Sequence, residues 1–251
     1  MGKIIAVHSF RGGTGKSNVT ASLAALLAGD GYRVAVIDTD IQSPGVHVLF
    51  GISGADVRRS LYDYLLGRCA IGEIAHEVTQ NLDGEVKGRV FFVPSSMRVN
   101  DIAHVLQSGY DVETLILGVQ ALVETLDLDV LFIDTHPGLN EATLMLIAAA
   151  HALVIVMRPD QQDYEGTAIT IDVARELEVS RMMLIVNKVP SVFDFGEVKA
   201  RVEETYACPV AAVLPHADEM MALASAGVFA MRYPDHPLTA ALKRAAALLV
   251  A

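Results

Sequence analysis

The 251-residue sequence has few of the residues that stabilise small secreted domains or build cysteine metal sites. Its two cysteines, Cys69 and Cys208, stand far apart without a CxxC pair, which excludes a disulfide framework and a cysteine zinc site and favours a reducing compartment. Only 20% of the residues are charged, whereas 52% are hydrophobic. This proportion excludes a disordered chain and is ample for a buried core.

Basic residues and long apolar runs are also scarce. Nineteen Lys and Arg stand against 30 Asp and Glu, a net charge of −11, so contact with nucleic acid or anionic lipid would need a local basic patch. The most apolar stretch, residues 142–157, contains His151 and is shorter than the ~20 residues that cross a bilayer. The first ten residues lack the length and cleavage site of a signal peptide. We therefore expect a soluble cytoplasmic protein.

Short apolar segments rich in β-branched residues recur along the chain, and helical segments separate them. Strands that are apolar on both faces are typical of parallel sheets covered by helices on each side. The predicted strands are residues 3–8, 33–38, 89–93, 129–134, 152–157, 182–187 and 210–214. The predicted helices are residues 16–28, 112–126, 141–150, 164–177, 195–206 and 237–250.

Residues 43–78 fit this alternation least well, and we interpret them as an elaborated crossover with short helical pieces at residues 60–66 and 71–78. No internal repeat, linker or change of composition divides the chain. The sequence therefore predicts an α/β fold with a doubly wound, mainly parallel sheet and helices on both faces. We expect residues 1–251 to form a single domain.

A glycine-rich segment, GGTGKS at residues 12–17, directly follows the first predicted strand and precedes the first predicted helix. Glycines let backbone N–H groups approach a phosphate closely, and the helix N-terminus adds partial positive charge. Lys16 is expected to reach the β- and γ-phosphates, and the Ser17 hydroxyl to bind Mg²⁺. The expected nucleotide-binding residues of this loop are Gly12, Gly13, Thr14, Gly15, Lys16, Ser17 and Asn18.

Carboxylates end two of the predicted strands. Asp38 and Asp40 close residues 33–40, and Asp134 closes an apolar strand of the Walker B kind. Because the carboxyl ends of parallel strands share one edge of a sheet, these carboxylates are suited to balance metal charge and orient a water beside the phosphate loop.

The loop departs from the usual P-loop pattern GxxxxGK(S/T), because Phe10 stands at the position of the first glycine and Arg11 precedes the glycine pair. This arrangement resembles the deviant Walker A motif KGGxGK(S/T) of the MinD/ParA/Mrp superfamily, and the likeness covers almost the whole chain. The resemblance implies that Asp38 lies near the Mg²⁺ shell and that Asp40 orients the attacking water. It also implies that Asp134 holds Mg²⁺ through a water.

Two further segments are similar to the family's nucleotide contacts. Residues 135–138 resemble its switch II, which implies that the N–H of Gly138 is available to the γ-phosphate. Within them, His136 is either a pH- or partner-sensing residue or an incidental one. Asn187 resembles the adenine-contacting asparagine, and the corner at Pro215 is expected to add backbone contacts. Because Pro190 stands where guanine-selective proteins carry aspartate, ATP is favoured over GTP.

Arg11 replaces the family's signature lysine, which crosses a dimer interface and touches the partner subunit's nucleotide. A guanidinium keeps the charge and offers a planar fork for phosphate oxygens. Two interpretations are open: Arg11 acts in trans within an ATP-bound homodimer, or it is a local cation on a surface loop. The expected catalytic residues are Arg11, Lys16 and Asp40.

Other features separate the branches of this superfamily. We expect no appended membrane-targeting helix, because the last predicted helix already reaches residue 250. Neither lone cysteine is expected to hold an Fe–S cluster. Nonspecific DNA binding is possible but is not favoured by the net charge. The arginines that could form a basic patch are Arg175, Arg181, Arg201, Arg232 and Arg244.

The resemblance therefore implies an ATP-binding and ATP-hydrolysing dimerisation switch that positions a partner or cargo in a prokaryotic cell. Its cofactors would be ATP and Mg²⁺, and hydrolysis would be slow without an activating protein. Two alternatives are open. One is an ATP-dependent small-molecule synthetase of the related P-loop group, and the other is a nucleotide-gated binding module without hydrolysis.

Overall fold

The computed structural model describes residues 2–41 and 43–251. Its centre is an eight-stranded sheet in the order β3-β4-β2-β5-β1-β6-β7-β8, in which every neighbouring pair is parallel except β3 with β4. The strands are β1 (Lys3–His8), β2 (Arg33–Asp38), β3 (His76–Glu77), β4 (Arg89–Val93), β5 (Val130–Asp134), β6 (Ala152–Met157), β7 (Met182–Val189) and β8 (Val210–Pro215). This is the doubly wound, mainly parallel α/β fold predicted from the sequence.

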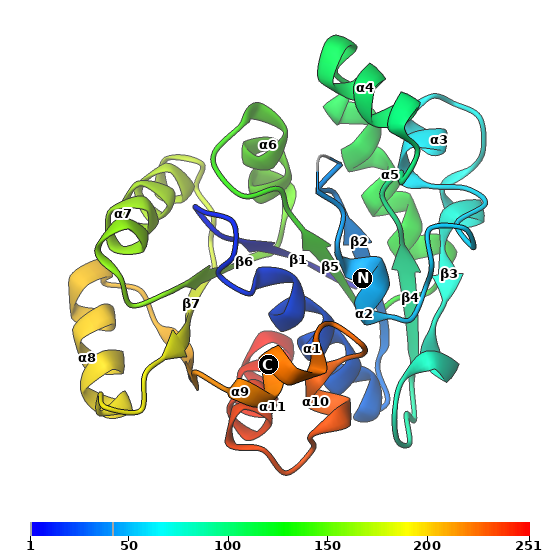
Figure 1. Cartoon of the computed structure of the whole chain (residues 1–251). Helices are drawn as coiled ribbons and strands as arrows, with labels where there is room; N and C mark the ends of the chain where they lie inside the picture. Colours follow the sequence, from blue (N-terminus) through cyan, green and yellow to red (C-terminus); the bar gives the residue numbers. More distant parts are fainter. Residues whose placement is uncertain (1, 42) are drawn as a thin grey trace.

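Helices cover both faces of the sheet (Figure 1). One face packs against α1 (Lys16–Gly29), α2 (Val46–Leu49), α10 (Phe229–Arg232) and α11 (Pro237–Val250). The other packs against α3 (Leu61–Leu65), α5 (Val112–Thr125), α6 (Glu141–Ala149), α7 (Gln161–Glu176) and α8 (Phe195–Tyr206). The remaining elements are η1 (Ile71–Ile74), η2 (Thr79–Asn81), α4 (Val99–Ser108) and α9 (Asp218–Leu223).

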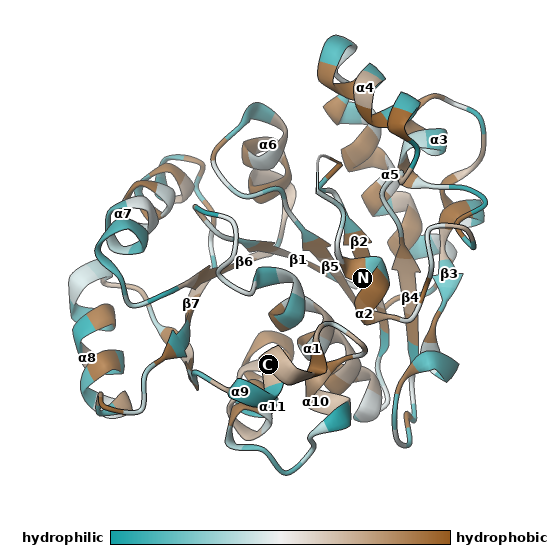
Figure 2. Cartoon of the chain, viewed as in Figure 1, coloured by the Kyte–Doolittle hydropathy of each residue, from teal (hydrophilic) through white to brown (hydrophobic). Residues whose placement is uncertain are grey.

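The strands are apolar on both faces because both are covered, and they form the brown centre of the molecule in Figure 2. Helix α1 is buried along nearly its whole length, since it lies between the sheet and helices α10 and α11. These contacts remove apolar surface from water at roughly 25 cal/mol per Å², which is the main source of stability in such a core. No helix in the described ranges is both long and apolar enough to span a bilayer.

Helix boundaries agree with simple capping chemistry. The Asp111 side chain accepts a hydrogen bond from the Glu113 N–H at the start of α5, and Asp194 accepts one from the Glu197 N–H at the start of α8. Helix α7 begins at Gln161, three residues before the predicted start, because Asp160 caps it by accepting from the Asp163 N–H.

The crossover is where the sequence interpretation was wrong. The predicted helical piece at residues 71–78 is a short 3-10 turn, η1, followed by the antiparallel edge strand β3. Strand β3 has only two residues, which are too few to show the alternation that would identify a strand in the sequence. Helices α2, α4, α9 and α10 were not predicted, and three of them are six residues or shorter.

The topology places the candidate site. Strand β1 leads through α1 to β2 on one side of the sheet, whereas its neighbour β6 leads through α7 to β7 on the other side, so the strand order reverses between β1 and β6. Ligands of open α/β sheets bind in the crevice at such a point. The glycine-rich loop between β1 and α1 lies there, beside the ends of β2 and β5, where Asp38 pairs in register with Asp134.

Candidate functional site

A cavity of about 430 Å³ opens at this edge, and we name it the phosphate cavity. All seven loop residues predicted to bind the nucleotide line it, and Asp40 and His136 face it from the ends of β2 and β5. Its lining residues are Ser9, Gly12, Gly13, Thr14, Gly15, Lys16, Ser17, Asn18, Asp40, Ser43, His136 and Pro137.

The backbone of the loop is shaped as an anion cradle. Gly13 and Gly15 have φ of 80° and 92°, a left-handed conformation that glycine adopts without steric cost. A Cβ built on Gly12 would meet no atom within 4 Å, so the backbone is open to close approach. The buried Thr14 hydroxyl has no hydrogen-bond partner within the described residues. Together these features fit an oxygen-rich ligand at the N-terminus of α1.

Behind the loop, the carboxylate of Asp134 accepts hydrogen bonds from three side chains of α1. Asp134 Oδ2 accepts from Lys16 Nζ at 2.6 Å and from Ser17 Oγ at 2.7 Å, and Oδ1 accepts from Thr20 Oγ1 at 2.8 Å. Thr20 was missed by sequence reasoning, although its place one helical turn after Lys16 is a usable signal. Asp134 is buried and does not line the cavity, so Ser17 is the member of this group that reaches it together with Lys16.

Asp38 is fully buried, although its place at the end of a strand predicted a carboxylate close to the metal. Its carboxylate accepts from the backbone N–H groups of Asp40, Gly45 and Val46, at 3.0–3.3 Å. Burial, reinforced by the negative charge of Asp134, raises the pKa of Asp38 to about 7. Asp38 therefore lies close to the other site residues but does not line the phosphate cavity. Its carboxylate instead stabilises the loop that follows β2.

Asp40 is the carboxylate at the cavity. Its Oδ1 accepts from the Ser43 N–H at 2.9 Å, and His136 Nε2 lies 3.8 Å from the same oxygen. The structure thus places His136 beside Asp40 at the site, which the sequence alone left undecided. The N–H of Gly138 donates to the Ser9 carbonyl at 3.1 Å, so it must leave this bond to reach a phosphate.

A second cavity of about 450 Å³ shares Gly15 and Asn18 with the phosphate cavity and continues it; we name it the base cavity. Asn187 and Pro215, the two residues expected to contact adenine, line it. Apolar side chains such as Met220 and Leu238 complete a wall suited to a flat ring. Asn187 itself donates through Nδ2 to the Thr14 carbonyl at 2.8 Å.

Arg11 points away from this site toward the start of α7. Its Nε lies 3.2 Å from Asp163 Oδ1, and the guanidinium also contacts Gln162 and Asp160. The neighbouring Phe10 ring packs so closely on Gly166 that an added Cβ would lie 2.0 Å from it. Phe10, which stands at the first glycine position of the usual P-loop, and Arg11, which replaces the lysine of the deviant motif, therefore both contact α7.

The donor set fits Mg²⁺ bound together with a nucleotide. The described residues contain no group of three or more His, Cys, Asp or Glu side chains arranged to hold a metal by themselves. Mg²⁺ is commonly held by one or two protein oxygens together with waters and phosphate oxygens. Ser17 at the cavity, with the Asp134 carboxylate behind it, offers hard oxygen donors of this kind.

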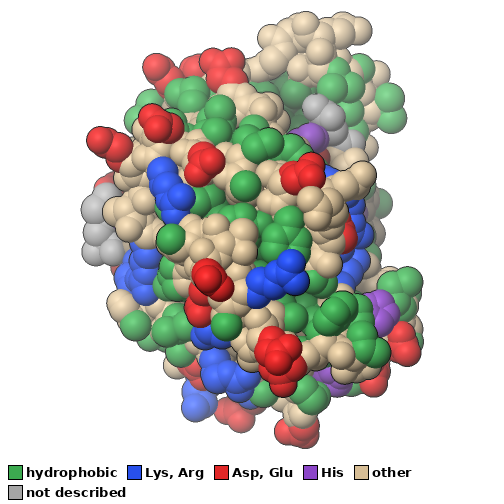
Figure 3. All heavy atoms as spheres, turned by 90° about the vertical axis from the view of Figure 1, so that its left-hand side faces the viewer, with side chains coloured by type: hydrophobic (Ala, Val, Ile, Leu, Met, Phe, Trp, Pro, Cys, Tyr) green, Lys and Arg blue, Asp and Glu red, His purple; other side chains and the backbone are tan. Residues whose placement is uncertain are grey.

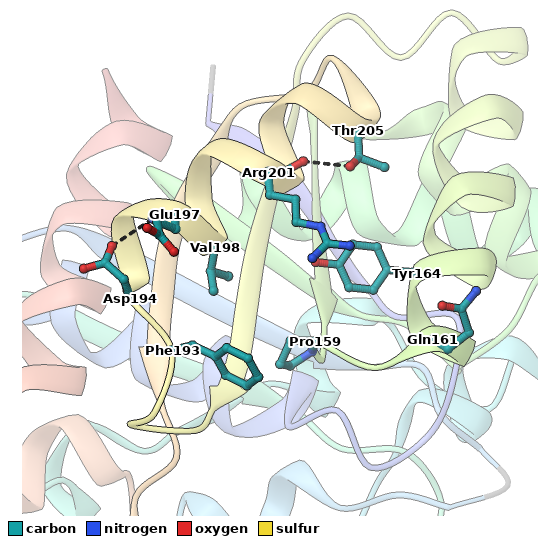
Figure 4. Close-up of a pocket in the computed structure, with 9 residues that line it drawn as sticks. All are labelled: Pro159, Gln161, Tyr164, Phe193, Asp194, Glu197, Val198, Arg201 and Thr205. Carbon is teal, nitrogen blue, oxygen red and sulfur yellow. Dashed lines mark hydrogen bonds between the residues drawn. The ribbon is translucent and has the colours of Figure 1, made fainter.

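A third cavity, of about 490 Å³ between α7 and α8, shares no lining residue with the phosphate or base cavity (Figure 4). In the close-up, the Arg201 side chain extends beside the Tyr164 ring, and Pro159 and Phe193 lie at the other end. A synthetase substrate would have to lie next to the transferred phosphate. This cavity does not meet that requirement.

The arginines considered for DNA binding are largely engaged within the chain. Arg175 donates to the Tyr206 carbonyl at the end of α8, and Arg181 donates to the Leu248 carbonyl in the last turn of α11. Such contacts place positive charge at the negative end of a helix. Arg232 pairs with Asp83. The face in Figure 3 shows Lys and Arg interspersed with Asp and Glu.

Comparison with known families agrees with this geometry. A family model described as AAA domain matches residues 2–183. The chain belongs to the MinD/ParA-like P-loop ATPases. In the fold of this family, the MinD cell division ATPase of Pyrococcus furiosus superposes with a TM-score of 0.83 at 20% identity, covering 99% of this chain and 98% of that one. The MinD protein of Pyrococcus horikoshii, complexed with Mg-ADP, gives a TM-score of 0.81 at 20% identity, covering 99% and 96%.

Curated relatives of this MinD/ParA-like protein differ in length. An uncharacterized ATP-binding protein of Methanocaldococcus jannaschii is 28% identical over 247 residues, which are 98% of this chain and 87% of the relative. The antiactivator FleN of Pseudomonas aeruginosa is 33% identical over 156 residues, which are 62% of this chain and 50% of the relative. The matched region thus spans about half the length of FleN.

Proposed function

We propose that this chain binds and hydrolyses Mg·ATP and that ATP binding switches it from monomer to homodimer. The observation that carries the proposal is the continuous phosphate and base cavity, with the loop glycines, Lys16 and Ser17 at one end and Asn187 at the other. In this scheme Lys16 and the loop N–H groups bind the phosphates, and the metal, when bound, neutralises charge on the phosphate oxygens.

Asp40 carries the proposed hydrolysis step. Its carboxylate lies at the cavity wall, held by the Ser43 N–H, where it can orient a water toward the terminal phosphate. Orientation of the nucleophile is the main task left to the protein in phosphoryl transfer. We propose that Arg11 completes the site of a partner subunit, and that Gly138 turns its N–H toward the γ-phosphate in the ATP-bound state.

The product of such a cycle is a timed conformational state, which a second protein reads. Two relatives, named as an antiactivator and as a flagellum site-determining protein, support a regulatory or positioning role for this chain. We propose a cytoplasmic protein of one P-loop domain whose slow hydrolysis is accelerated by an activating partner.

Light scattering after size exclusion tests the switch. Wild type and Asp40→Ala are compared with Mg·ATP, Mg·ADP and no nucleotide, and phosphate release is measured on the same samples. We expect a dimer only with Mg·ATP, persistence of that dimer in Asp40→Ala, and hydrolysis slower by about 10²-fold or more in the variant.

Two results would contradict the proposal. The proposed nucleotide site would be refuted if calorimetry detected no heat of Mg·ATP binding to wild type. It would also be refuted if Lys16→Ala bound Mg·ATP with unchanged affinity. A fixed oligomeric state whatever the nucleotide removes the switch and favours the synthetase. A dimer that forms with ATP but releases no phosphate favours the binding module without hydrolysis.

A further inference from the structure

Strand β7 is irregular where it meets the phosphate loop. Its pairing with β8 advances three residues along β7, from Val186 to Val189, against two along β8. Within this bulge Lys188 has φ of 58°, a left-handed conformation that is unfavourable for any residue with a Cβ. Bulges beside functional sites commonly re-aim side chains. In a regular strand, Asn187 and Lys188 would point to opposite faces of the sheet.

The bulge instead lets both side chains reach the same loop. Asn187 Nδ2 donates to the Thr14 carbonyl, and Lys188 Nζ donates to the Gly13 carbonyl, each at 2.8 Å. These carbonyls belong to two consecutive peptide units. Neither Asn187 nor Lys188 lines the phosphate cavity, but both line the base cavity, so they contact the loop from the base side of the site.

Fixing these carbonyls also fixes the donors that face the ligand. In a trans peptide the C=O and N–H groups point in opposite directions. Carbonyls drawn toward β7 therefore turn the N–H groups of Thr14 and Gly15 toward the phosphate cavity. Within the described residues, neither N–H donates to a backbone carbonyl. They are donors prepared for an anion.

We propose that Lys188 is a positioning residue of the phosphate loop. Its ammonium group, aimed by the β7 bulge, holds the Gly13 peptide so that the N–H groups of Thr14 and Gly15 face the β-phosphate of a nucleoside di- or triphosphate. The inference rests on the proposed nucleotide binding of the same site. The bond is charge-assisted and therefore stronger than a neutral one.

A positioning role and a merely structural role predict opposite behaviour for Lys188→Gly. Glycine adopts φ of 58° without strain, so the backbone of the bulge is relieved while the ammonium group is lost. We expect an unchanged or higher melting temperature together with weaker binding of ligands that carry a β-phosphate. If Lys188 only stabilised the fold, its replacement would lower both the melting temperature and the affinity for these ligands.

The experiment measures Mg·ADP and Mg·ATP affinity by calorimetry, and AMP affinity by competition against a fluorescent methylanthraniloyl ADP. Lys188→Gly should weaken Mg·ADP and Mg·ATP by about tenfold, as expected for loss of one charged hydrogen bond, and leave AMP within about twofold. Lys188→Arg, which keeps a charged donor, should recover most of the affinity. Glu178→Gly relieves a similar φ of 55° just after α7 and should change no affinity.

Each outcome decides one question. Wild type that binds no nucleotide refutes the proposed function. If wild type binds, unchanged Mg·ADP affinity in Lys188→Gly overturns the role of Lys188. An equal loss of AMP affinity overturns it too, because the residue would then act on the base cavity. A lower melting temperature accompanying weaker binding assigns Lys188 to the fold alone.

Discussion

Single glycines of the phosphate loop differ in what an added methyl group would meet. A Cβ on Gly15 would lie 2.4 Å from Asn187 Nδ2, whereas one on Gly12 would meet nothing within 4 Å. We expect Gly12→Ala to keep the melting temperature within about 2 °C but to weaken Mg·ATP binding by about tenfold or more, because the methyl group occupies space needed for close phosphate approach. Calorimetry and thermal unfolding measure the two effects, and unchanged affinity would contradict the cradle.

His8 provides a second test at the scale of one residue. Burial, followed by the positive charge of Lys16 and then by His136, lowers the pKa of His8 from 6.5 to about 3. The folded protein keeps the imidazole neutral, while the unfolded chain binds a proton below pH 6.5. Its stabilising contribution is therefore present above that pH and is lost as the pH falls toward 3.

We expect wild type to lose about 2 kcal/mol more unfolding free energy than His8→Asn between pH 8 and pH 5. Urea unfolding at both pH values measures this difference. Asparagine can keep a hydrogen bond to Thr135 Oγ1, which lies 2.9 Å from His8 Nδ1. Asp38 titrates in both proteins, so its contribution cancels. Equal losses would show that His8 titrates normally.

At the scale of elements, prediction succeeded where burial on both faces dictated the residue type. The bounds of β1, β2, β4 and β6 are those read from continuous apolar segments, and α11 is confirmed at Pro237–Val250. Helix α4 was missed because it lies at the surface: Val99 and Leu106 are exposed and only Asp101 is buried. Val99, Ile102 and Leu106 nevertheless recur at helical spacing, a signal that the sequence interpretation did not use.

The site shows the same division. The loop at residues 12–18 and the carboxylate of Asp40 were predicted from spacing, and the structure gathers them at one cavity. Lys188 was not predicted, because its role arises from a β-bulge that depends on the register between β7 and β8. The depth of Asp38 was also missed, since a strand-end carboxylate can point into the loop that follows as easily as into a cavity.

Helix α7 gives a prediction at the element scale. Its Gly166 leaves room for the Phe10 ring, and a Cβ there would lie 2.0 Å from Phe10 Cδ1. Although alanine favours helices, we expect Gly166→Ala to lower the unfolding free energy by about 1–3 kcal/mol through overpacking. Gly29→Ala, at the end of α1 where a Cβ meets nothing within 4 Å, should change it little. Equal stability of the two variants in urea unfolding would remove the packing argument.

At the scale of the whole molecule, Arg11 links the nucleotide loop to α7 in one chain and, as proposed, to a second subunit. The guanidinium contacts Gln162 and Asp160 at the start of α7 and lies 3.2 Å from the buried carboxylate of Asp163. A side chain held by its own subunit must leave these partners before it can contact another nucleotide. The contacts of Arg11 with α7 therefore compete with its proposed contact with the nucleotide of the partner subunit.

This competition predicts effects of opposite sign. Arg11→Ala removes the group that would act in trans and should lower ATP hydrolysis by about tenfold or more, with a smaller dimer fraction in Mg·ATP. Gln162→Ala weakens only the hold within the chain, so it should raise the dimer fraction about two- to fivefold at subsaturating protein concentration. Light scattering and phosphate release on both variants measure this. A shift of both variants in the same direction, or no shift in Arg11→Ala, would leave Arg11 as a local contact between the loop and α7.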